Sequence, residues 1–482
     1  MIEGWAGLAP AIGEIALLTL ACTVLLFDAF AGESGRRLTA PLSIGALLVL
    51  LVLLIQTWPQ ESLVTLSGHF VADPLASLLK IVATVTAAIV FVYSRRYVAD
   101  RGIEKGEYWI LSLFGLLGIF VLSSAYSFLT LYLGLELLSL SLYALVAFDR
   151  KSAVSAESAM KYFVLGAIAS GALLYGFSLV YGVTGALSLG EVAAASADLD
   201  QGASLVLVVG IAFMVVGVAF KLGGVPFHMW LPDVYHGAPT SVTMYVATVS
   251  KIGALALALR LLQDGLAGHH ADWQGMLVVV TMLSLAVGNI VAIAQTNVKR
   301  LLAYSAISHV GFILLGLSNG TPMGNAAALL YTIVYVLMAA GAFGVIILLT
   351  RAGFEADELT DLAGLNERSR WFAGIMLVMM FSMAGLPPFL GFHAKVAIIQ
   401  STLDAGQTWL AVFAILMSVI GAFYYIRVIK LMYFDSSEQE QTLMQDATAR
   451  VVLSANGLAV LLLGFFPAPL LALCVAVIAG AA

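Results

Sequence analysis

The sequence predicts an all-α polytopic membrane protein with about 14 transmembrane helices, which include two inverted five-helix repeats that each contain a broken helix. Three observations predict this class. Of the 482 residues, 61% are hydrophobic and only 10% are charged, which excludes one large water-soluble core. Apolar runs of membrane-spanning length follow one another along the chain. Two of these runs, one in each half, are interrupted by glycine and proline.

The apolar runs cover most of the chain and leave short polar connections between them. The first run is retained as a span because no basic segment or cleavage pattern marks it as a signal peptide. We place about fourteen spans at residues 11–31, 40–57, 74–93, 108–123, 126–147, 157–181, 204–228, 241–262, 273–295, 299–317, 323–350, 372–402, 408–433 and 451–477.

The basic residues orient these spans. Most of the 22 lysines and arginines lie in or beside every second connection, as do Arg95, Arg96, Lys299 and Arg300, whereas the connection at 185–201 is acidic. Basic connections face the cytoplasm by the positive-inside rule. Because an even number of spans returns the chain to the side where it began, both termini are predicted to lie on the opposite side.

Two spans are predicted to break at membrane depth. Proline removes a backbone donor and glycine readily leaves the helical conformation. The breaks are predicted at Gly223, Gly224 and Pro226 in the first half and at Gly385, Pro387 and Pro388 in the second. Interrupted backbone is tolerated there only where it lines protein or a water-filled cavity, and a pair of such segments points to a transport site.

The spacing of the breaks predicts an internal repeat. Pro226 and Pro388 are separated by nearly the same number of residues as the starts of the fourth and ninth spans. Because five spans is an odd number, the second unit enters the membrane from the opposite face. The alternative is two unrelated proline kinks. The predicted segments are 1–107 with three helices, 108–262 and 273–433 with the repeats, and 434–482 with the last helix.

Ionisable side chains inside the spans are the candidate site. Glu136, Lys221 and Lys251 fall in the first repeat and Lys395 in the second. Charges at the centre of a bilayer are costly and normally face a partner or water. A carboxylate that moves toward or away from a buried lysine changes whether the lysine holds a proton, so the set predicts a proton carrier. A protonated glutamate in a helix contact, or a static buried ion pair, are the alternatives.

Three histidines are candidate relays between these lysines. His309 lies in the middle of a span, His228 follows the first break and His393 precedes Lys395. Histidine transfers protons near neutral pH. For His309, a hydrogen-bonded core histidine is an equally good explanation, and His228 is a weaker candidate than His309. Two further basic residues lie inside spans. Lys80 remains a weaker candidate, and Arg260 is expected to reach the interface from a helix end.

Several long motifs surround the ionisable residues. They read GLELLSLSLYALVAF around Glu136, KLGGVPFHMWLPDVYHGAPTSV from Lys221, SKIGA at Lys251, NVKRLLAYSAISHVG around His309 and AGLPPFLGFHAK at Lys395. With these motifs the sequence resembles the antiporter-like subunits of respiratory complex I over nearly the whole chain. Within that family it is most similar to the subunit N branch of bacterial NADH–quinone oxidoreductase (NDH-1).

The resemblance implies a proton-translocating membrane subunit of an NADH–quinone oxidoreductase. It implies transport roles for Glu136, Lys221, Lys251 and Lys395, with His309 as a connector. FMN, iron–sulfur clusters, NADH and quinone are expected in other subunits and no cofactor in this chain. The expected partners are the other membrane subunits, including the sister antiporter-like subunits, and the lipid bilayer, without nucleic acid. The expected location is the bacterial inner membrane, with both termini periplasmic.

Two other functions are weighed against this one. A subunit of a multi-protein monovalent cation/proton antiporter would share the fold and the glutamate–lysine pairs. A haem-bearing electron carrier would use His228, His309 or His393, but the spans offer no obvious facing pair. No metal site is predicted, because Cys22 and Cys474 lie in apolar runs near opposite ends of the chain.

Overall fold

The computed structural model describes residues 8–197, 199–351, 354–436, 443–444 and 446–481. Within them, thirteen helices are long and apolar enough to cross a membrane. One further crossing is made by α18 (Arg370–Ala384) and α19 (Leu390–Asp404), which are shorter halves of one interrupted span. The predicted all-α polytopic membrane class is therefore confirmed.

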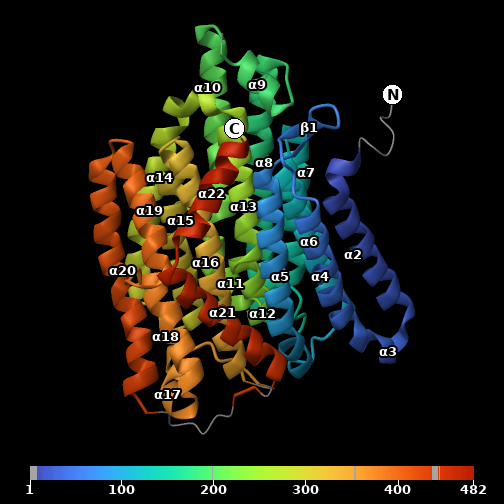
Figure 1. Cartoon of the computed structure of the whole chain (residues 1–482), viewed down its shortest axis with the longest axis vertical. Helices are drawn as coiled ribbons and strands as arrows, with labels where there is room; N and C mark the ends of the chain where they lie inside the picture. Colours follow the sequence, from blue (N-terminus) through green and yellow to red (C-terminus); the bar gives the residue numbers. More distant parts are fainter. Residues whose placement is uncertain (1–7, 198, 352–353, 437–442, 445, 482) are drawn as a thin grey trace.

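The spans stand side by side along the long axis of the molecule (Figure 1). In chain order they are α2 (Ile12–Phe30), α4 (Thr39–Gln56), α5 (Pro74–Asp100), α6 (Gly106–Ser124), α7 (Phe128–Val146), α8 (Ala153–Thr184), α10 (Gln201–Leu222) with α11 (Trp230–Gly237), α12 (Thr240–Ala247) with α13 (Val249–Leu259), α14 (His270–Ile293), α15 (Val298–Ser318), α16 (Pro322–Leu349), α18 with α19, α20 (Thr408–Phe434), and α21 (Ala447–Phe465) with α22 (Ala468–Ala481).

The connections carry little regular structure. A short antiparallel hairpin of β1 (Leu63–Thr65) and β2 (Phe70–Ala72) follows α4, and α9 (Leu189–Ala195) precedes α10. The short helices α3 (Gly32–Gly35) and α17 (Leu365–Arg368) lie at the other end of the bundle (Figure 1). Among the described residues, these connections contain no separate folded domain, so the membrane-spanning helices make up almost all of the protein.

A few central helices are shielded from lipid by the others. The most apolar stretch of the α12–α13 span is 100% buried within the protein, and those of α15 and α16 are 94% buried, against 28% for the span of α2. Ionisable side chains inside a membrane protein normally face such an interior and not lipid. The centre of the bundle is therefore where this chain can keep charged groups.

Glycines allow two pairs of helices to approach closely. A Cβ atom on Gly118 of α6 would lie 2.6 Å from the backbone nitrogen of Leu138 in α7, and one on Gly288 of α14 would lie 2.6 Å from that of Ser308 in α15. Small residues serve this purpose in membrane helices because van der Waals contact holds the helices together. The two pairs open the two predicted repeats, and this parallel supports the repeat, which stays a prediction.

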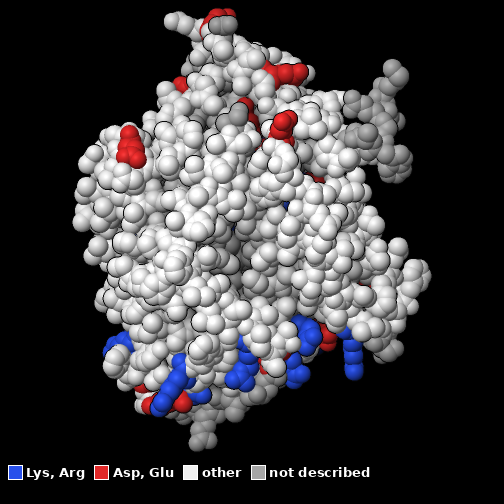
Figure 2. Space-filling view, viewed as in Figure 1, with Lys and Arg blue, Asp and Glu red and all other residues white. Residues whose placement is uncertain are grey.

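Charge separates the two ends of the molecule. Figure 2 shows lysine and arginine side chains gathered at the lower end, whereas the start of α2 and the end of α22 lie toward the upper end (Figure 1). This is the arrangement that alternating basic connections require. The direction in which the bundle faces the cytoplasm stays a prediction from the positive-inside rule.

The sequence missed three irregularities in the spans. The seventh span is predicted to end at residue 228, but after its break the chain resumes as helix at Trp230 and continues to Gly237. The eighth is interrupted at Thr248, whose hydroxyl donates to the carbonyl oxygen of Met244 at 2.6 Å, a bond that bends helices. The last span divides before Ala468, because Pro467 offers no backbone donor to continue the helix.

The close helix contact at Gly118 makes a test of the packing. Gly118→Ala should destabilise the purified chain in detergent by about 1–3 kcal/mol, because the methyl group would meet backbone atoms of α7. Gly171→Ala, in an exposed part of α8 with open space around the new atom, should be neutral or stabilising by up to about 1 kcal/mol. Thermal unfolding measures both, and equal melting temperatures would contradict the packing described here.

Candidate functional site

The two breaks have the same local geometry. Helix α10 ends at Leu222 and is followed by Gly223 with φ +86°, and helix α18 ends at Ala384 and is followed by Gly385 with φ +84°. Only glycine adopts this left-handed conformation without strain. Each break also contains a cis peptide bond before a proline, at Pro226 and Pro388. The last carbonyls of each half-helix have no partner within the helix.

A buried lysine binds the carbonyl end of each interrupted helix. Lys251 Nζ on α13 donates to the carbonyl oxygen of Leu222 at 2.6 Å. Lys395 Nζ on α19 donates to the carbonyl oxygen of Ala384 at 2.8 Å and to Ser418 Oγ on α20 at 2.8 Å. The carbonyl end of a helix carries partial negative charge, which stabilises an ammonium group there.

Aromatic rings complete the walls around these two lysines. Lys251 Nζ lies 5.6 Å from the centre of the Trp230 ring, and Lys395 Nζ lies 5.2 Å from that of Phe312. Trp230 is fixed by a hydrogen bond from Nε1 to the carbonyl oxygen of Phe220 at 3.1 Å and by stacking on Tyr162. The face of an aromatic ring attracts a cation and also excludes water. Both lysines therefore occupy buried sites in which a nearby ring favours the ammonium group.

Lys221 and Glu136 extend the first lysine site into a row. Lys221, in the last turn of α10, donates from Nζ to Ser139 Oγ on α7 at 2.8 Å. Glu136 lies one turn before Ser139 on the same helix and is half-buried. Among the described residues it makes no direct ion pair with Lys221, and its buried Oε1 has no hydrogen-bond partner. Lys221 nevertheless interacts electrostatically with both Glu136 and Lys251.

His309 belongs to the second lysine site. Its Nδ1 lies 2.8 Å from the hydroxyl of Tyr331 and its Nε2 lies 3.0 Å from the hydroxyl of Tyr425. Tyr425 also bonds Ser305 Oγ at 2.5 Å. His309 interacts electrostatically with Lys395. The histidine is therefore hydrogen-bonded between two tyrosine hydroxyls and is close enough to Lys395 to interact with its charge.

The other two predicted relays are not brought to their lysines by any contact among the described residues. His228 is half-buried, and its Nδ1 is buried without a hydrogen-bond partner. His393 is also half-buried and packs edge-on against the ring of Phe392. Of the three histidines, the structure joins only His309 to the candidate site.

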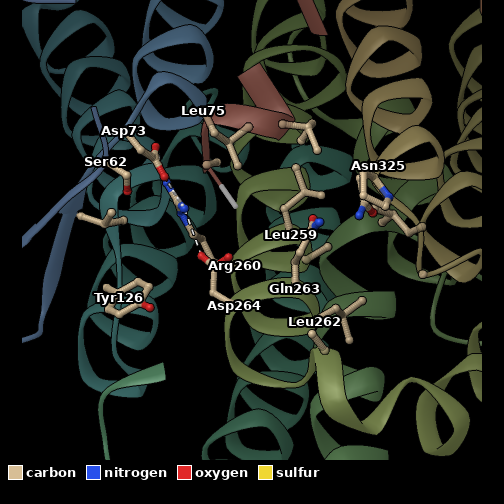
Figure 3. Close-up of a pocket in the computed structure, with 18 of the residues that line it drawn as sticks. Ser62, Asp73, Leu75, Tyr126, Leu259, Arg260, Leu262, Gln263, Asp264 and Asn325 are labelled. Carbon is tan, nitrogen blue, oxygen red and sulfur yellow. Dashed lines mark hydrogen bonds and ion pairs between the residues drawn. The ribbon is translucent and has the colours of Figure 1, made fainter. Parts of the chain in front are cut away.

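Arg260 does not reach the interface, contrary to the expectation from its position near a helix end. It is 1% exposed and donates to both carboxylate oxygens of Asp73 at 2.7 and 2.8 Å, to Asp264 at 3.0 Å and to the carbonyl oxygen of Ser123 at 2.9 Å. Figure 3 shows this cluster in the wall of a cavity of about 510 Å³. The bidentate Arg260–Asp73 pair is a strong contact that holds the guanidinium in place. The sequence did not predict it, because Asp73 is far from Arg260 in the chain.

Several side chains of the candidate site escaped the sequence analysis. Ser139 could have been found, because it lies three residues after Glu136 and therefore on the same helix face. Ser418, Tyr331 and Tyr425 come from separate helices, and only the fold brings them to Lys395 and His309. Among the described residues, no group of three or more histidine, cysteine, aspartate or glutamate side chains could hold a metal ion.

The chain is similar to one family of membrane proteins. Residues 125–453 match the family described as NADH:quinone oxidoreductase/Mrp antiporter, TM. A protein of Thioalkalivibrio sulfidiphilus named NADH-quinone oxidoreductase subunit N is 55% identical over 464 residues, which cover 96% of this chain and 97% of the relative. The resemblance inferred from the motifs is thereby confirmed.

Solved structures agree with this similarity. A chain of respiratory complex I from Thermus thermophilus superposes with a TM-score of 0.81 at 30% identity, covering 95% of this chain and 98% of that one. A chain of the Mrp complex from Dietzia sp. superposes with a TM-score of 0.84 at 22% identity, covering 98% of this chain and 97% of that one. The second match shows a shared fold alone.

The Arg260 cluster makes a quantitative test. Arg260→Met should destabilise the purified chain by about 3–5 kcal/mol, because Asp73 would stay buried without its cation. Arg96→Gln is the matched control, since Arg96 is 57% exposed and, in the part of the chain that the structure describes, pairs only with Asp100; this variant should change stability by less than about 1 kcal/mol. Unfolding midpoints in detergent measure both. A similar small effect from both variants would show that Arg260 is solvated after all.

Proposed function

The chain belongs to the NADH:quinone oxidoreductase/Mrp antiporter family of membrane subunits, and from this premise we propose that Glu136, Lys221, Lys251 and Lys395 carry the protons that it translocates. It is a multi-pass membrane protein and a proton-pumping subunit of a translocase of the NADH–quinone oxidoreductase type, complex I. The oxidation of NADH and the reduction of quinone are assigned to other subunits of the complex.

The observation that supports the proposal best is the ammonium of Lys251 against the open carbonyl end of α10. The carbonyl of Leu222 accepts a hydrogen bond from Lys251 Nζ, and an acceptor at a helix end favours the protonated amine. The neighbouring Lys221 has only the hydroxyl of Ser139 as a described hydrogen-bond partner. Since each charge repels the other, loading one lysine favours release of the proton from its neighbour.

The energies involved are of the size that pumping requires. Two unit charges about 4 Å apart interact by about 4 kcal/mol at an effective dielectric constant of about 20, and less at longer separation. Moving one charge against 100 mV costs about 2.3 kcal/mol. A change in the distance between Glu136 and Lys221 can therefore decide whether a proton stays or leaves, and such linked groups titrate together.

The second half of the chain offers a similar station. Lys395 binds the carbonyl end of α18 and the hydroxyl of Ser418. His309, Tyr331 and Tyr425 form a hydrogen-bonded chain beside it, and hydroxyl and imidazole groups can pass protons along such a chain. We assign these residues the role of relay, and place the two stations in the repeats 108–262 and 273–433.

The remaining assignments follow the family. The partners of the chain are other subunits of the complex, and we propose that they include sister antiporter-like subunits. We place the protein in the bacterial inner membrane with both termini in the periplasm. FMN, iron–sulfur clusters, NADH and quinone belong to other subunits in this proposal.

Neither competing function is favoured. The likeness to the Mrp complex is one of fold at 22% identity, whereas the relative from Thioalkalivibrio sulfidiphilus named subunit N is 55% identical. A haem carrier would need paired histidines on facing helices. Both ring nitrogens of His309 are occupied by tyrosine hydroxyls, and no described contact pairs His228, whose Nδ1 is free, with a second histidine.

Replacing the carriers tests the proposal. Lys221→Met and Glu136→Gln should leave a complex that still co-purifies with flavin and iron–sulfur subunits, while proton pumping coupled to NADH oxidation falls about 10–100-fold. The reason is that each variant deletes a group that must gain and lose a proton. Pumping in reconstituted vesicles, followed with a pH-sensitive dye, measures the effect. Undiminished pumping in both variants would refute the carrier role.

The hydroxyl beside Lys221 gives a finer test. Ser139→Ala removes the described acceptor of the Lys221 ammonium and leaves a buried donor unsatisfied at a cost of about 1–3 kcal/mol, so the pumping rate should fall about 5–100-fold. Ser141→Ala is the control on the same helix, since the one hydrogen bond of the Ser141 side chain to a described residue is to the carbonyl oxygen of Leu137. If both variants pump at the same rate, the contact between Ser139 and Lys221 is not used.

A further inference from the structure

The N-terminal helices hold a buried lysine and carboxylate that take no part in the site described above. Lys80 Nζ on α5 lies 2.5 Å from Glu14 Oε1 on α2, and the two side chains are 6% and 12% exposed. The rings of Phe70 and Phe120 lie 5.4 and 5.8 Å from the same nitrogen. The pair therefore sits in an apolar enclosure outside both predicted repeats.

The carboxylate of Glu14 is poorly satisfied. Among the described residues, Lys80 is its one cationic partner, and no donor meets either oxygen in hydrogen-bond geometry. The first turn of α2 adds only the weak positive field of a helix start. Desolvation of a carboxylate is costly when few donors replace water. The ionised form of Glu14 thus depends on one neighbour that can itself lose a proton.

The Arg260 cluster is the contrasting case within the same chain. Asp73 accepts two bonds from Arg260 and one from the backbone nitrogen of Ala76, and an arginine side chain does not lose its proton in proteins. In that cluster the Asp73 carboxylate has several hydrogen-bond donors, and the charge of its cationic partner does not change. The Glu14 carboxylate has no such set of donors, and its partner Lys80 can lose a proton.

A cavity leads to the lysine. It has a volume of about 190 Å³ and is lined by residues that include Gly13, Thr57, Glu61, Ser77 and Lys80. Several waters fit in such a space, since each occupies about 30 Å³ in the liquid. The exposed Glu61 lies in its wall. The cavity lies beside the β1–β2 hairpin and the start of α2, at the end of the molecule opposite the basic residues (Figures 1 and 2).

Among the residues that the structure describes, few other charges act on this pair. Glu61 is the other titratable group in the described wall of the cavity. Helix α4, which packs against α2 and α5, has no charged residue between its bounds. Helix α6 has only Glu107, in its first turn at the basic end of the bundle. Asp73, at the start of α5, is neutralised by Arg260.

We propose that Lys80 and Glu14 form a third protonatable site, which exchanges protons with the aqueous phase at the end of the molecule opposite the basic residues. Lys80, which lines the cavity, passes a proton from its ammonium to the paired Glu14 carboxylate, so that an N–H bond breaks and an O–H bond forms. The Lys80 amine then takes a proton from a hydronium ion in the cavity, which leaves water and a carboxylic acid beside the ammonium. In the reverse direction, Lys80 returns a proton to a cavity water as hydronium and takes the proton of the Glu14 carboxylic acid, which restores the ion pair. This inference goes beyond the proposed function and does not depend on the row of Glu136, Lys221 and Lys251.

Chemical labelling in native membranes tests protonation directly. A hydrophobic carbodiimide reacts with a carboxyl group only in its protonated form, and peptide mass spectrometry locates the product. Labelling is carried out at several values between about pH 6 and about pH 9, and Glu14 should be modified in the unaltered chain. Asp73 is the internal control and should stay unmodified.

In Lys80→Met, which removes the ammonium, modification of Glu14 should rise at every pH. An unmodified Glu14 in the unaltered chain throughout this range would make the pair a static tether of α2 and overturn the proposal.

Cysteine accessibility tests the route. In a chain carrying Cys22→Ser and Cys474→Ala, Ser77→Cys should react with a membrane-impermeant thiol reagent applied at the end opposite the basic connections, about tenfold or more faster than Leu79→Cys. Leu79 is the control because it neighbours Lys80 in sequence but is 1% exposed and does not line the cavity. Reaction from the basic end alone, or from neither end, would contradict the access route.

Discussion

The structure depends on one interaction, the ammonium group of a buried lysine against the open carbonyl end of an interrupted helix. An unpaired charge in hydrocarbon costs several kcal/mol, and so does an unpaired carbonyl. Each cost is reduced when the two groups meet, as Lys251 meets Leu222 and Lys395 meets Ala384. The break and the lysine therefore explain each other. A helix without its break would offer no acceptor, and a break without its lysine would leave carbonyls unsatisfied.

The surrounding bundle keeps this interaction away from lipid. The α12–α13 span, α15 and α16 are enclosed by the outer helices, and glycine contacts such as the one at Gly118 let those helices pack at short distance. Aromatic rings at Trp230 and Phe312 exclude water without removing the attraction for a cation. The result is a dry interior in which small changes in distance between charges alter their energies strongly.

Much of this architecture could be predicted from the sequence because the bilayer limits the choices. Span length, alternating basic connections and glycine–proline interruptions gave the all-α class, the number of crossings and the places of the two breaks. The identities of Lys221, Lys251 and Lys395 as buried groups followed from their positions in apolar runs. The family resemblance, which rested on motifs at these residues, was confirmed by relatives.

The failures concern partners that are distant in sequence. Arg260 was expected at the interface because nothing near it in the sequence shows Asp73. Tyr331 and Tyr425 reach His309 only in the folded bundle. The breaks at Thr248 and before Ala468 occur at a single threonine and a single proline within long apolar runs. His228 and His393 carried the right chemistry in sequence, but no described contact joins them to the lysines.

Chemical rescue at Lys251 is the most direct measurement of the central claim, that these lysines act by gaining and losing protons. In the background of Cys22→Ser and Cys474→Ala, Lys251→Cys should abolish coupled pumping, and alkylation with bromoethylamine, which restores a titratable amine, should recover it. Alkylation with bromoethyltrimethylammonium installs a permanent charge and should not. Equal recovery with both reagents would mean that Lys251 serves only as a fixed charge, and would contradict the account.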